Sequence, residues 1–174
     1  MLEDTRIRCF PPVADPATAR VLILGSMPGA ASLDANQYYA HPRNQFWSIM
    51  GTLFGAHPAL PYAERLAMLT GAGVALWDVL SSCERRGSLD SAIDLRSAQA
   101  NDFAAFLERH AGIRRVLFNG ALADTCFRRN VMPHVRPLDM LRLPSTSPAH
   151  AGLSASDKLH VWRTALQPSA VDVV

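Results

Sequence analysis

A short apolar run at residues 21–24, Val-Leu-Ile-Leu, constrains the fold of this chain more than any other segment. It shows no alternation of polar and apolar residues, which is typical of a strand buried on both faces of a parallel sheet. The sequence Gly-Ser-Met-Pro-Gly follows at residues 25–29. Glycine allows close approach to the main chain, and proline fixes φ. The segment therefore predicts a central strand that ends in a ligand-binding turn at the carboxyl edge of the sheet.

Strand and helix signals alternate along the rest of the chain. Further strands are predicted at residues 73–78, at 114–119 and within 135–143, and helices at 44–54, 62–70, 102–110, 121–129 and 156–166. The polar segment at residues 79–90 lacks helical periodicity and is predicted to be an active-site loop. Strands that alternate with helices imply a parallel sheet covered on both faces. We expect an α/β fold of three layers, α/β/α, with a central, mainly parallel four-stranded sheet.

Length and composition set broad limits. A chain of 174 residues with 49% hydrophobic residues suits a single domain over residues 1–174, with an irregular arm at about 1–19 and a frayed tail at about 168–174. The charged start and the lack of an apolar run of roughly 20 residues predict a cytoplasmic protein. Three widely spaced cysteines argue against a disulfide framework or a structural zinc. A net charge of +2 is too mild to demonstrate a nucleic-acid partner.

A second informative segment, Tyr-Tyr-Ala-His-Pro-Arg-Asn-Gln-Phe-Trp, occupies residues 38–47 of a chain that is only 7% aromatic. Aromatic rings beside hydrogen-bonding groups suit a pocket for a flat heterocycle, because the ring stacks and the polar groups read the edge. Phe46 and Trp47 belong to the apolar face of the predicted helix and are expected in the core. Asn44 has two interpretations, a helix cap or a group that acts on a ligand.

Polar residues also follow the other predicted strands. Asp78 either contacts a ligand or forms a cap or an ion pair with a neighbouring arginine. Asn119, which precedes a glycine, either contacts substrate or stabilises a turn, and the turn is the commoner role. The segment Pro-Ser-Thr-Ser-Pro at residues 144–148 is a stiff loop whose hydroxyls suit phosphate contact. His150 is either a solvated loop histidine or a further phosphate contact.

Together, Gly-Ser-Met-Pro-Gly, the segment at residues 38–47 and Leu-Pro-Ser-Thr-Ser-Pro-Ala-His at 143–150 resemble the uracil-DNA glycosylase superfamily, most closely its hypoxanthine-DNA (deoxyinosine) glycosylase branch. The mismatch-specific uracil glycosylases are also similar. The resemblance extends from about residue 21 to about residue 162. It implies a repair enzyme, with DNA containing deaminated bases as its partner, that flips a deaminated base, chiefly hypoxanthine, out of DNA and hydrolyses its glycosidic bond. It also implies a monomer that requires no metal or cofactor; glycosylases with an iron-sulfur cluster need four cysteines.

The resemblance also implies roles for single residues. Met27 stands where most branches carry an Asp or Asn that orients the attacking water, so Asn44 is expected to be the catalytic residue. Tyr39 falls where relatives stack an aromatic ring on the extruded base, and Asp78 aligns with an Asn that reads the base edge, where an ionised carboxylate would accept the ring N–H. Further base-binding residues are Gly25, Ser26, Met27, Pro28, Gly29 and Asn119. Expected DNA contacts are His41, Arg43, Ser145, Thr146, Ser147 and His150.

Two departures and two alternatives accompany this interpretation. Leu143 occupies the position of a histidine that stabilises the departing base in one branch, so that form of assistance is absent. Lys158, the only lysine, lies in the terminal helix pattern away from the motifs, which favours a monofunctional hydrolase over a Schiff-base lyase. The alternatives are a uracil or mismatch glycosylase with nearly the same pocket, and a nucleic-acid-binding module without catalysis.

Overall fold

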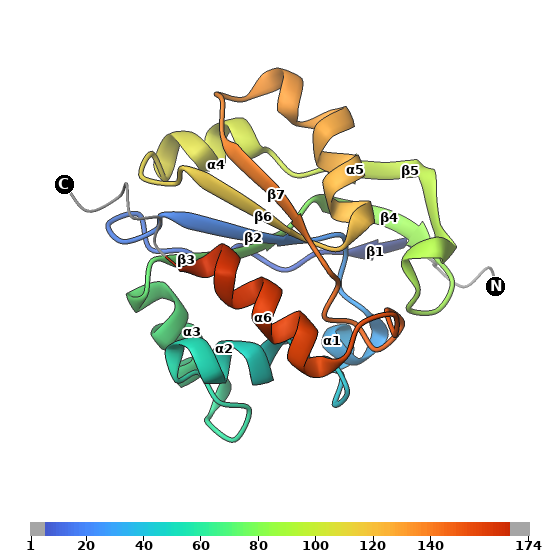
Figure 1. Cartoon of the computed structure of the whole chain (residues 1–174). Coiled ribbons are helices and arrows are strands. Elements are labelled where there is room, and N and C mark those ends of the chain that lie inside the picture. The colour runs from blue at the N-terminus through green and yellow to red at the C-terminus, as the bar shows by residue number, and fades with distance from the viewer. Residues whose placement is uncertain (1–5, 168–174) are drawn as a thin grey trace.

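The computed structural model describes residues 6–167, so the predicted frayed tail at 168–174 lies outside the described residues. Strands and helices alternate through most of this length (Figure 1). The strands are β1 (Arg6–Arg8), β2 (Val21–Gly25), β3 (Val74–Asp78), β4 (Leu80–Arg85), β5 (Ile93–Ala100), β6 (Arg115–Asn119) and β7 (Asp139–Leu143). The helices are α1 (Ala30–Ala35), α2 (Phe46–Phe54), α3 (Tyr62–Gly71), α4 (Phe103–Arg109), α5 (Ala121–Asn130) and α6 (Ala155–Leu166), with short 3-10 helices η1 (Asp90–Ala92) and η2 (Met132–His134).

The central sheet has the strand order β3-β2-β6-β7, and all of its neighbouring pairs are parallel. This confirms the predicted α/β class and the four-stranded parallel sheet. Gly25 pairs with Asp78 at the end of β2 and β3, and Asn119 pairs with Leu143 at the end of β6 and β7. Because parallel strands end at the same edge, the polar residues that follow them gather there.

Helices cover both faces of the sheet, and alternate strand residues supply the two cores. Leu22 and Leu24 pack with α4 and α5 on one face, and Ile23 packs with α2, α3 and α6 on the other. Each of these strand side chains is fully buried, which explains the unbroken apolar run of β2. Phe46 and Trp47 lie in the second core, as the apolar face of the predicted helix requires.

The prediction of an active-site loop at residues 79–90 is wrong for residues 80–85, while residues 86–89 are irregular as predicted. Residues 80–85 form β4, the middle strand of an antiparallel sheet with the order β1-β4-β5. Register shifts in the β4–β5 pairing interrupt the regular alternation that would have marked a strand in the sequence. The arm at 1–19 is likewise more regular than expected, because it holds β1 and a bridge between Val13 and Leu76. The short helix α1 was not predicted either. Within residues 6–167, no helix is long and apolar enough to cross a membrane.

Candidate active site

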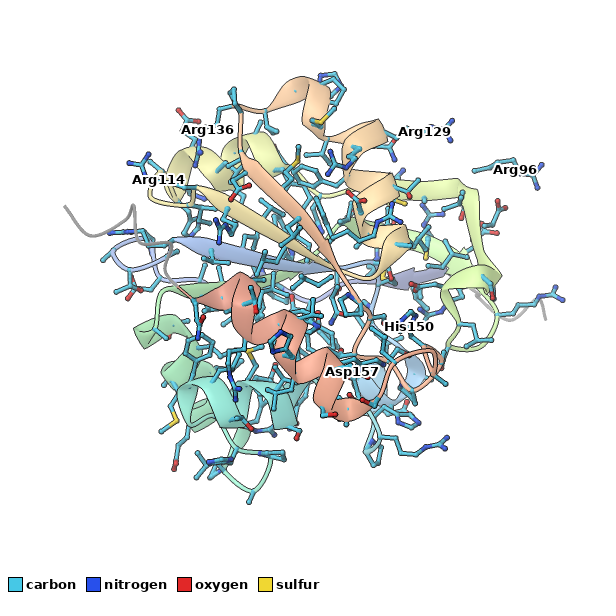
Figure 2. All side chains as sticks on the ribbon, in the orientation of Figure 1. Arg96, Arg114, Arg129, Arg136, His150 and Asp157 are labelled. Carbon is cyan, nitrogen blue, oxygen red and sulfur yellow. The ribbon has the colours of Figure 1, made fainter. Side chains whose placement is uncertain are left out.

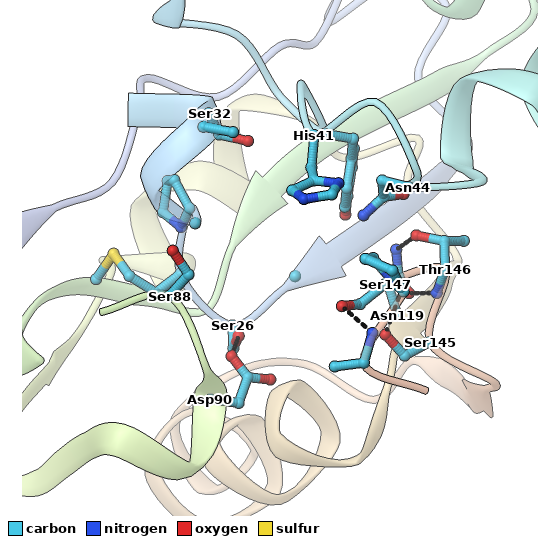
Figure 3. Close-up of a pocket in the computed structure, with 18 of the residues that line it drawn as sticks. Ser26, Ser32, His41, Asn44, Ser88, Asp90, Asn119, Ser145, Thr146 and Ser147 are labelled. Atoms are coloured by element: carbon cyan, nitrogen blue, oxygen red, sulfur yellow. Dashed lines mark hydrogen bonds between the residues drawn. The ribbon is translucent and has the colours of Figure 1, made fainter. Parts of the chain in front are cut away.

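A cavity of about 590 Å³ opens at the carboxyl edge of the central sheet (Figure 3). Its walls come from the turn after β2, the segment before α2, the turn before η1 and the loop after β7. Every residue for which the sequence predicts catalysis, base binding or DNA contact lines this cavity. The structure adds Ser32, which the sequence did not indicate, and also Ser88 and Asp90, which come from the segment predicted as an active-site loop but were not named singly. Segments separated by more than a hundred positions therefore share one site.

The turn at residues 25–29 forms the floor of the cavity, and its first glycine has no room for a side chain. A Cβ on Gly25 would lie 2.5 Å from Asp78 Oδ1 and 3.3 Å from Tyr39 Oη. The turn is held from the neighbouring sheet, since Arg85 Nη2 donates to the Pro28 carbonyl at 2.6 Å. Met27 is buried with only 6% exposure and packs into the core, so its thioether offers nothing that could hold a water molecule.

Tyr39 is fixed between the cavity and the core. Its ring stacks on Phe46 with centroids 4.0 Å apart and planes inclined by 23°. Its backbone has φ of +56°, a left-handed conformation that is uncommon for a bulky residue and often marks a functional site. The buried Oη has no hydrogen-bond partner among the described atoms. Burial, followed by the charge of Asp78, raises the pKa of the phenol.

Asn44 lies across the cavity from Ser26 and Asp90 (Figure 3). Its Oδ1 accepts a hydrogen bond from the Phe46 amide at 2.9 Å, at the start of α2. The helix begins at Phe46, two positions after the predicted start, so Asn44 precedes it and forms a cap-like turn. Asn44 therefore combines both interpretations, since it forms a cap-like hydrogen bond and also lines the cavity. The hydrogen bond fixes the orientation of its carboxamide.

The loop at residues 144–150 is anchored to β6 by one pair of side chains. Asn119 Nδ2 donates to Thr146 Oγ1, and the Thr146 amide donates to Asn119 Oδ1, both at 2.9 Å (Figure 3). Thr146 is fully buried, so its hydroxyl, which we expected to face phosphate, is turned inward. Ser145 and Ser147 are half-buried and remain at the cavity wall. Asn119 thus fulfils the turn-stabilising role that the sequence left open, while also lining the cavity.

Helix α6 holds both ends of the same loop. Trp162 Nε1 donates to the Pro144 carbonyl at 3.0 Å, and Lys158 Nζ donates to the His150 carbonyl at 2.6 Å. The expectation that Lys158 lies away from the motifs is therefore wrong, because its amine binds the carbonyl at the end of the loop. Lys158 is buried, which lowers the pKa of its amine, and it is not among the residues that line the cavity.

Two carboxylates and one arginine form an acidic corner of the cavity. Asp78 is 4% exposed, and its Oδ2 has no hydrogen-bond partner in the described part of the chain. Burial and then the charge of Asp90 raise the pKa of Asp78 to about 7, against a smaller opposite effect of Arg85. Asp90 accepts a hydrogen bond from Ser26 Oγ at 2.6 Å, and burial raises its pKa as well. The alternative that Asp78 forms an ion pair with a neighbouring arginine is wrong, because it makes none with Arg85 or Arg86 among residues 6–167.

Asp90 lies in the segment predicted as an active-site loop, but it belongs to no motif that would single it out. A single aspartate after Gly-Ser-Leu carries no signal of its own, and only the pairing of β4 with β5 brings it to Ser26. No cluster of three metal-binding side chains occurs within the described residues.

Basic and imidazole side chains lie both at the cavity and away from it. His41, Arg43 and His150 are exposed at the cavity and can reach a phosphate backbone. Figure 2 shows Arg114 and Arg136 at the other end of the molecule from His150. The cavity lining thus holds one arginine and two histidines, in keeping with the mild net charge of +2.

Comparisons with known proteins agree with the family resemblance of the sequence motifs. The sequence profile of the uracil DNA glycosylase superfamily matches residues 11–166. A protein of Methanosarcina barkeri named hypoxanthine DNA glycosylase is 38% identical over 112 residues, which are 64% of this chain and 69% of the relative. Its namesake from Methanosarcina acetivorans is 38% identical over 117 residues, 67% of this chain and 72% of the relative. A solution NMR structure from Methanosarcina acetivorans, provisionally assigned as a uracil DNA glycosylase, superposes with a TM-score of 0.71 at 32% identity and covers 91% of this chain and 98% of its own.

Proposed function

We propose, since this chain belongs to the uracil DNA glycosylase superfamily, that it is a DNA repair glycosylase that excises deaminated bases, chiefly hypoxanthine. One observation carries the proposal: a single cavity of about 590 Å³ is lined by the turn at 25–29, by Tyr39 and Asn44, and by the serines of the loop after β7. The similarity to two proteins named hypoxanthine DNA glycosylase supports the choice of base. Met27 supports it too, because the usual water-orienting group is missing at that position.

In the proposed reaction the damaged nucleotide leaves the duplex, because the glycosidic bond cannot be reached inside the helix, and a damaged pair costs less to open. Tyr39 stacks on the base with the face that Phe46 does not cover. Ser145, Ser147, His41, Arg43 and His150 bind the DNA backbone around the cavity.

Asn44 positions the attacking water and stabilises the positive charge that develops on the sugar through its carbonyl dipole. The hydrogen bond from the Phe46 amide supports this role in two ways. It fixes the orientation of the Asn44 carboxamide, and it leaves the second lone pair of Oδ1 available to the water. A neutral amide takes no proton at neutral pH, so Asn44 is not a general base. The turn amides at 25–29 contribute hydrogen bonds to the leaving base. The product is an abasic site.

Excision from defined duplexes tests the proposal. Matched duplexes with one deoxyinosine, one deoxyuridine or no lesion are incubated with the protein, and abasic sites are cleaved by alkali. We expect strand cleavage chiefly with deoxyinosine. Release of uracil alone would replace the proposal by a uracil glycosylase, and binding without any release would support a non-catalytic module.

Two further points belong to the proposal. The enzyme acts as a monofunctional hydrolase, since the Lys158 amine is bound to the loop carbonyl and lies outside the cavity lining. It works as a monomer in the cytoplasm on DNA. Borohydride treatment during turnover tests the first point, because a trapped covalent complex with DNA would reveal a Schiff-base intermediate and a lyase step.

A further inference from the structure

Asp78 is a buried carboxyl group at the cavity that no part of the proposed reaction yet explains. It ends β3 with 4% exposure, and its Oδ1 lies against the bare Cα of Gly25 in the floor turn. Its Oδ2 has no hydrogen-bond partner among residues 6–167, and its backbone carbonyl accepts a hydrogen bond from the Asn101 side chain at 2.8 Å. A carboxyl oxygen left without a partner in a buried position is costly unless a ligand completes it. Because Asp78 also lines the cavity, a bound ligand can form a hydrogen bond with this carboxyl group.

The groups that face Asp78 come from four elements, and they favour its neutral form. Asp90 of η1 brings a second negative charge, while Tyr38 and Tyr39 before α2 and Cys9 after β1 are neutral groups. Arg85 of β4 favours the ionised form of Asp78, but its hydrogen bonds go to the carbonyls of Gly87 and Pro28. Two close carboxyl groups without a dedicated cation retain a proton more readily than a lone aspartate does.

The proposed reaction lacks a proton donor. When the bond between C1′ and N9 breaks, the electron pair moves to the purine, and a purine anion is a poor leaving group unless it receives a proton. Asn44 is a neutral amide, the turn amides only donate hydrogen bonds, and the buried Leu143 is apolar. His41 and His150 are exposed at the cavity rather than buried beside the floor turn.

We propose that Asp78, a buried carboxyl group that lines the cavity and has one oxygen without a partner among residues 6–167, is the general acid that protonates the departing purine. In this step the bond between C1′ and N9 breaks, and the carboxyl proton moves to an acceptor atom of the base. The hydroxyl part of a water molecule bonds to C1′, and the remaining water proton returns to the Asp78 carboxylate. Neutral hypoxanthine and an abasic sugar result, and Asp78 ends as it began. Asp90 acts through Asp78 and is a positioning residue. The inference rests on the proposed release of hypoxanthine.

Single-turnover excision of hypoxanthine as a function of pH tests this role. Rates are measured from about pH 5 to about pH 9 for the unaltered protein, Asp78→Asn and Asp90→Asn. We expect the unaltered rate to fall as pH rises through about 7, where Asp78 loses its proton. Asp78→Asn should be slower at low pH by about 100-fold or more and should show no such fall. In Asp90→Asn the fall should move to lower pH, because a neighbouring negative charge no longer retains the proton.

The outcomes separate the two proposals. If the unaltered protein releases no hypoxanthine at any pH, the proposed function fails. If it releases hypoxanthine while Asp78→Asn keeps its rate within a few fold, only the general acid is overturned. The same holds if the fall in rate stays at the same pH in both variants. Circular dichroism and affinity for deoxyinosine duplex show that each variant is folded, and Asp90→Asn tests the proposal even if Asp78→Asn does not fold.

Discussion

Asn44 carries two separable duties, a cap-like hydrogen bond to the Phe46 amide and the proposed placement of water. Asn44→Ala should lower single-turnover excision by about 100-fold or more, as the loss of a transition-state dipole does. Its free energy of unfolding should fall by about 1 kcal/mol because the capping bond is lost. Asn44→Ser is the matched control, since its hydroxyl can accept the same amide. Serine should restore stability without restoring the rate, and a near-normal rate in Asn44→Ala would leave Asn44 as a cap only.

Tyr39 is expected to contribute binding through its ring, because the ring stacks on Phe46 and lines the cavity. Tyr39→Ala should weaken binding to deoxyinosine duplex by about 1 to 3 kcal/mol, the range for stacking on one base. Tyr39→Phe keeps the stacked ring and should bind like the unaltered protein. The Kd values are compared in the Asn44→Ala background, where the base is retained. Equal affinity of the alanine and phenylalanine variants would show that the Tyr39 ring does not stack on the base.

At the scale of elements, the loop after β7 depends on Asn119 of β6 for its shape. Asn119→Ala removes both hydrogen bonds to Thr146 and leaves a buried backbone amide unpaired, which should cost about 1 to 3 kcal/mol. Asn119→Asp still accepts from the Thr146 amide and can accept from its hydroxyl, so it should lose less stability. Urea unfolding measures the difference, and DNA affinity should decline in the same order. Equal stability of the two variants would contradict the anchoring role.

The elements that the sequence predicted are those whose signals are local. The apolar run of β2 and the apolar face of α2 identify themselves, and all five predicted helices occur with ends shifted by at most two residues. β4 could not be found this way, because residues 80–85 are ordered by pairing with residues 6–8 and 93–100, and register shifts hide its alternation. Motif resemblance located the lining of the cavity. Contacts that arise only from folding, such as Asp90 with Ser26 and Lys158 with the His150 carbonyl, left no local trace.

For the whole molecule, the acidic corner predicts how stability depends on pH. The folded-state pKa of Asp78 is raised from 3.8 to about 7, so between these values the native state holds a proton that the unfolded state has released. Stability therefore falls as pH rises through this interval, by up to a few kcal/mol, and Asp90 acts in the same direction. Urea unfolding at about pH 5 and pH 8 should show the lower stability at the higher pH.

Asp78→Asn is the control for this dependence, because an amide of nearly the same shape does not titrate. In that variant the difference between the two pH values should shrink to what Asp90 alone supplies. A midpoint that rises with pH in the unaltered protein would contradict the direction of both shifts.

The contact between Gly25 and Asp78 has a consequence for the way such a sequence can diverge. With only 2.5 Å between a Cβ at position 25 and the carboxyl oxygen at position 78, position 25 cannot gain a side chain unless Asp78 moves or changes. A relative with alanine or a larger residue at the first position must carry a shorter side chain at the second, or must displace β3 from β2. The two positions are expected to change together during evolution, and a paired substitution should be tolerated where Gly25→Ala by itself is not. Among related sequences, positions 25 and 78, which end two neighbouring strands, should therefore be conserved or substituted as a pair.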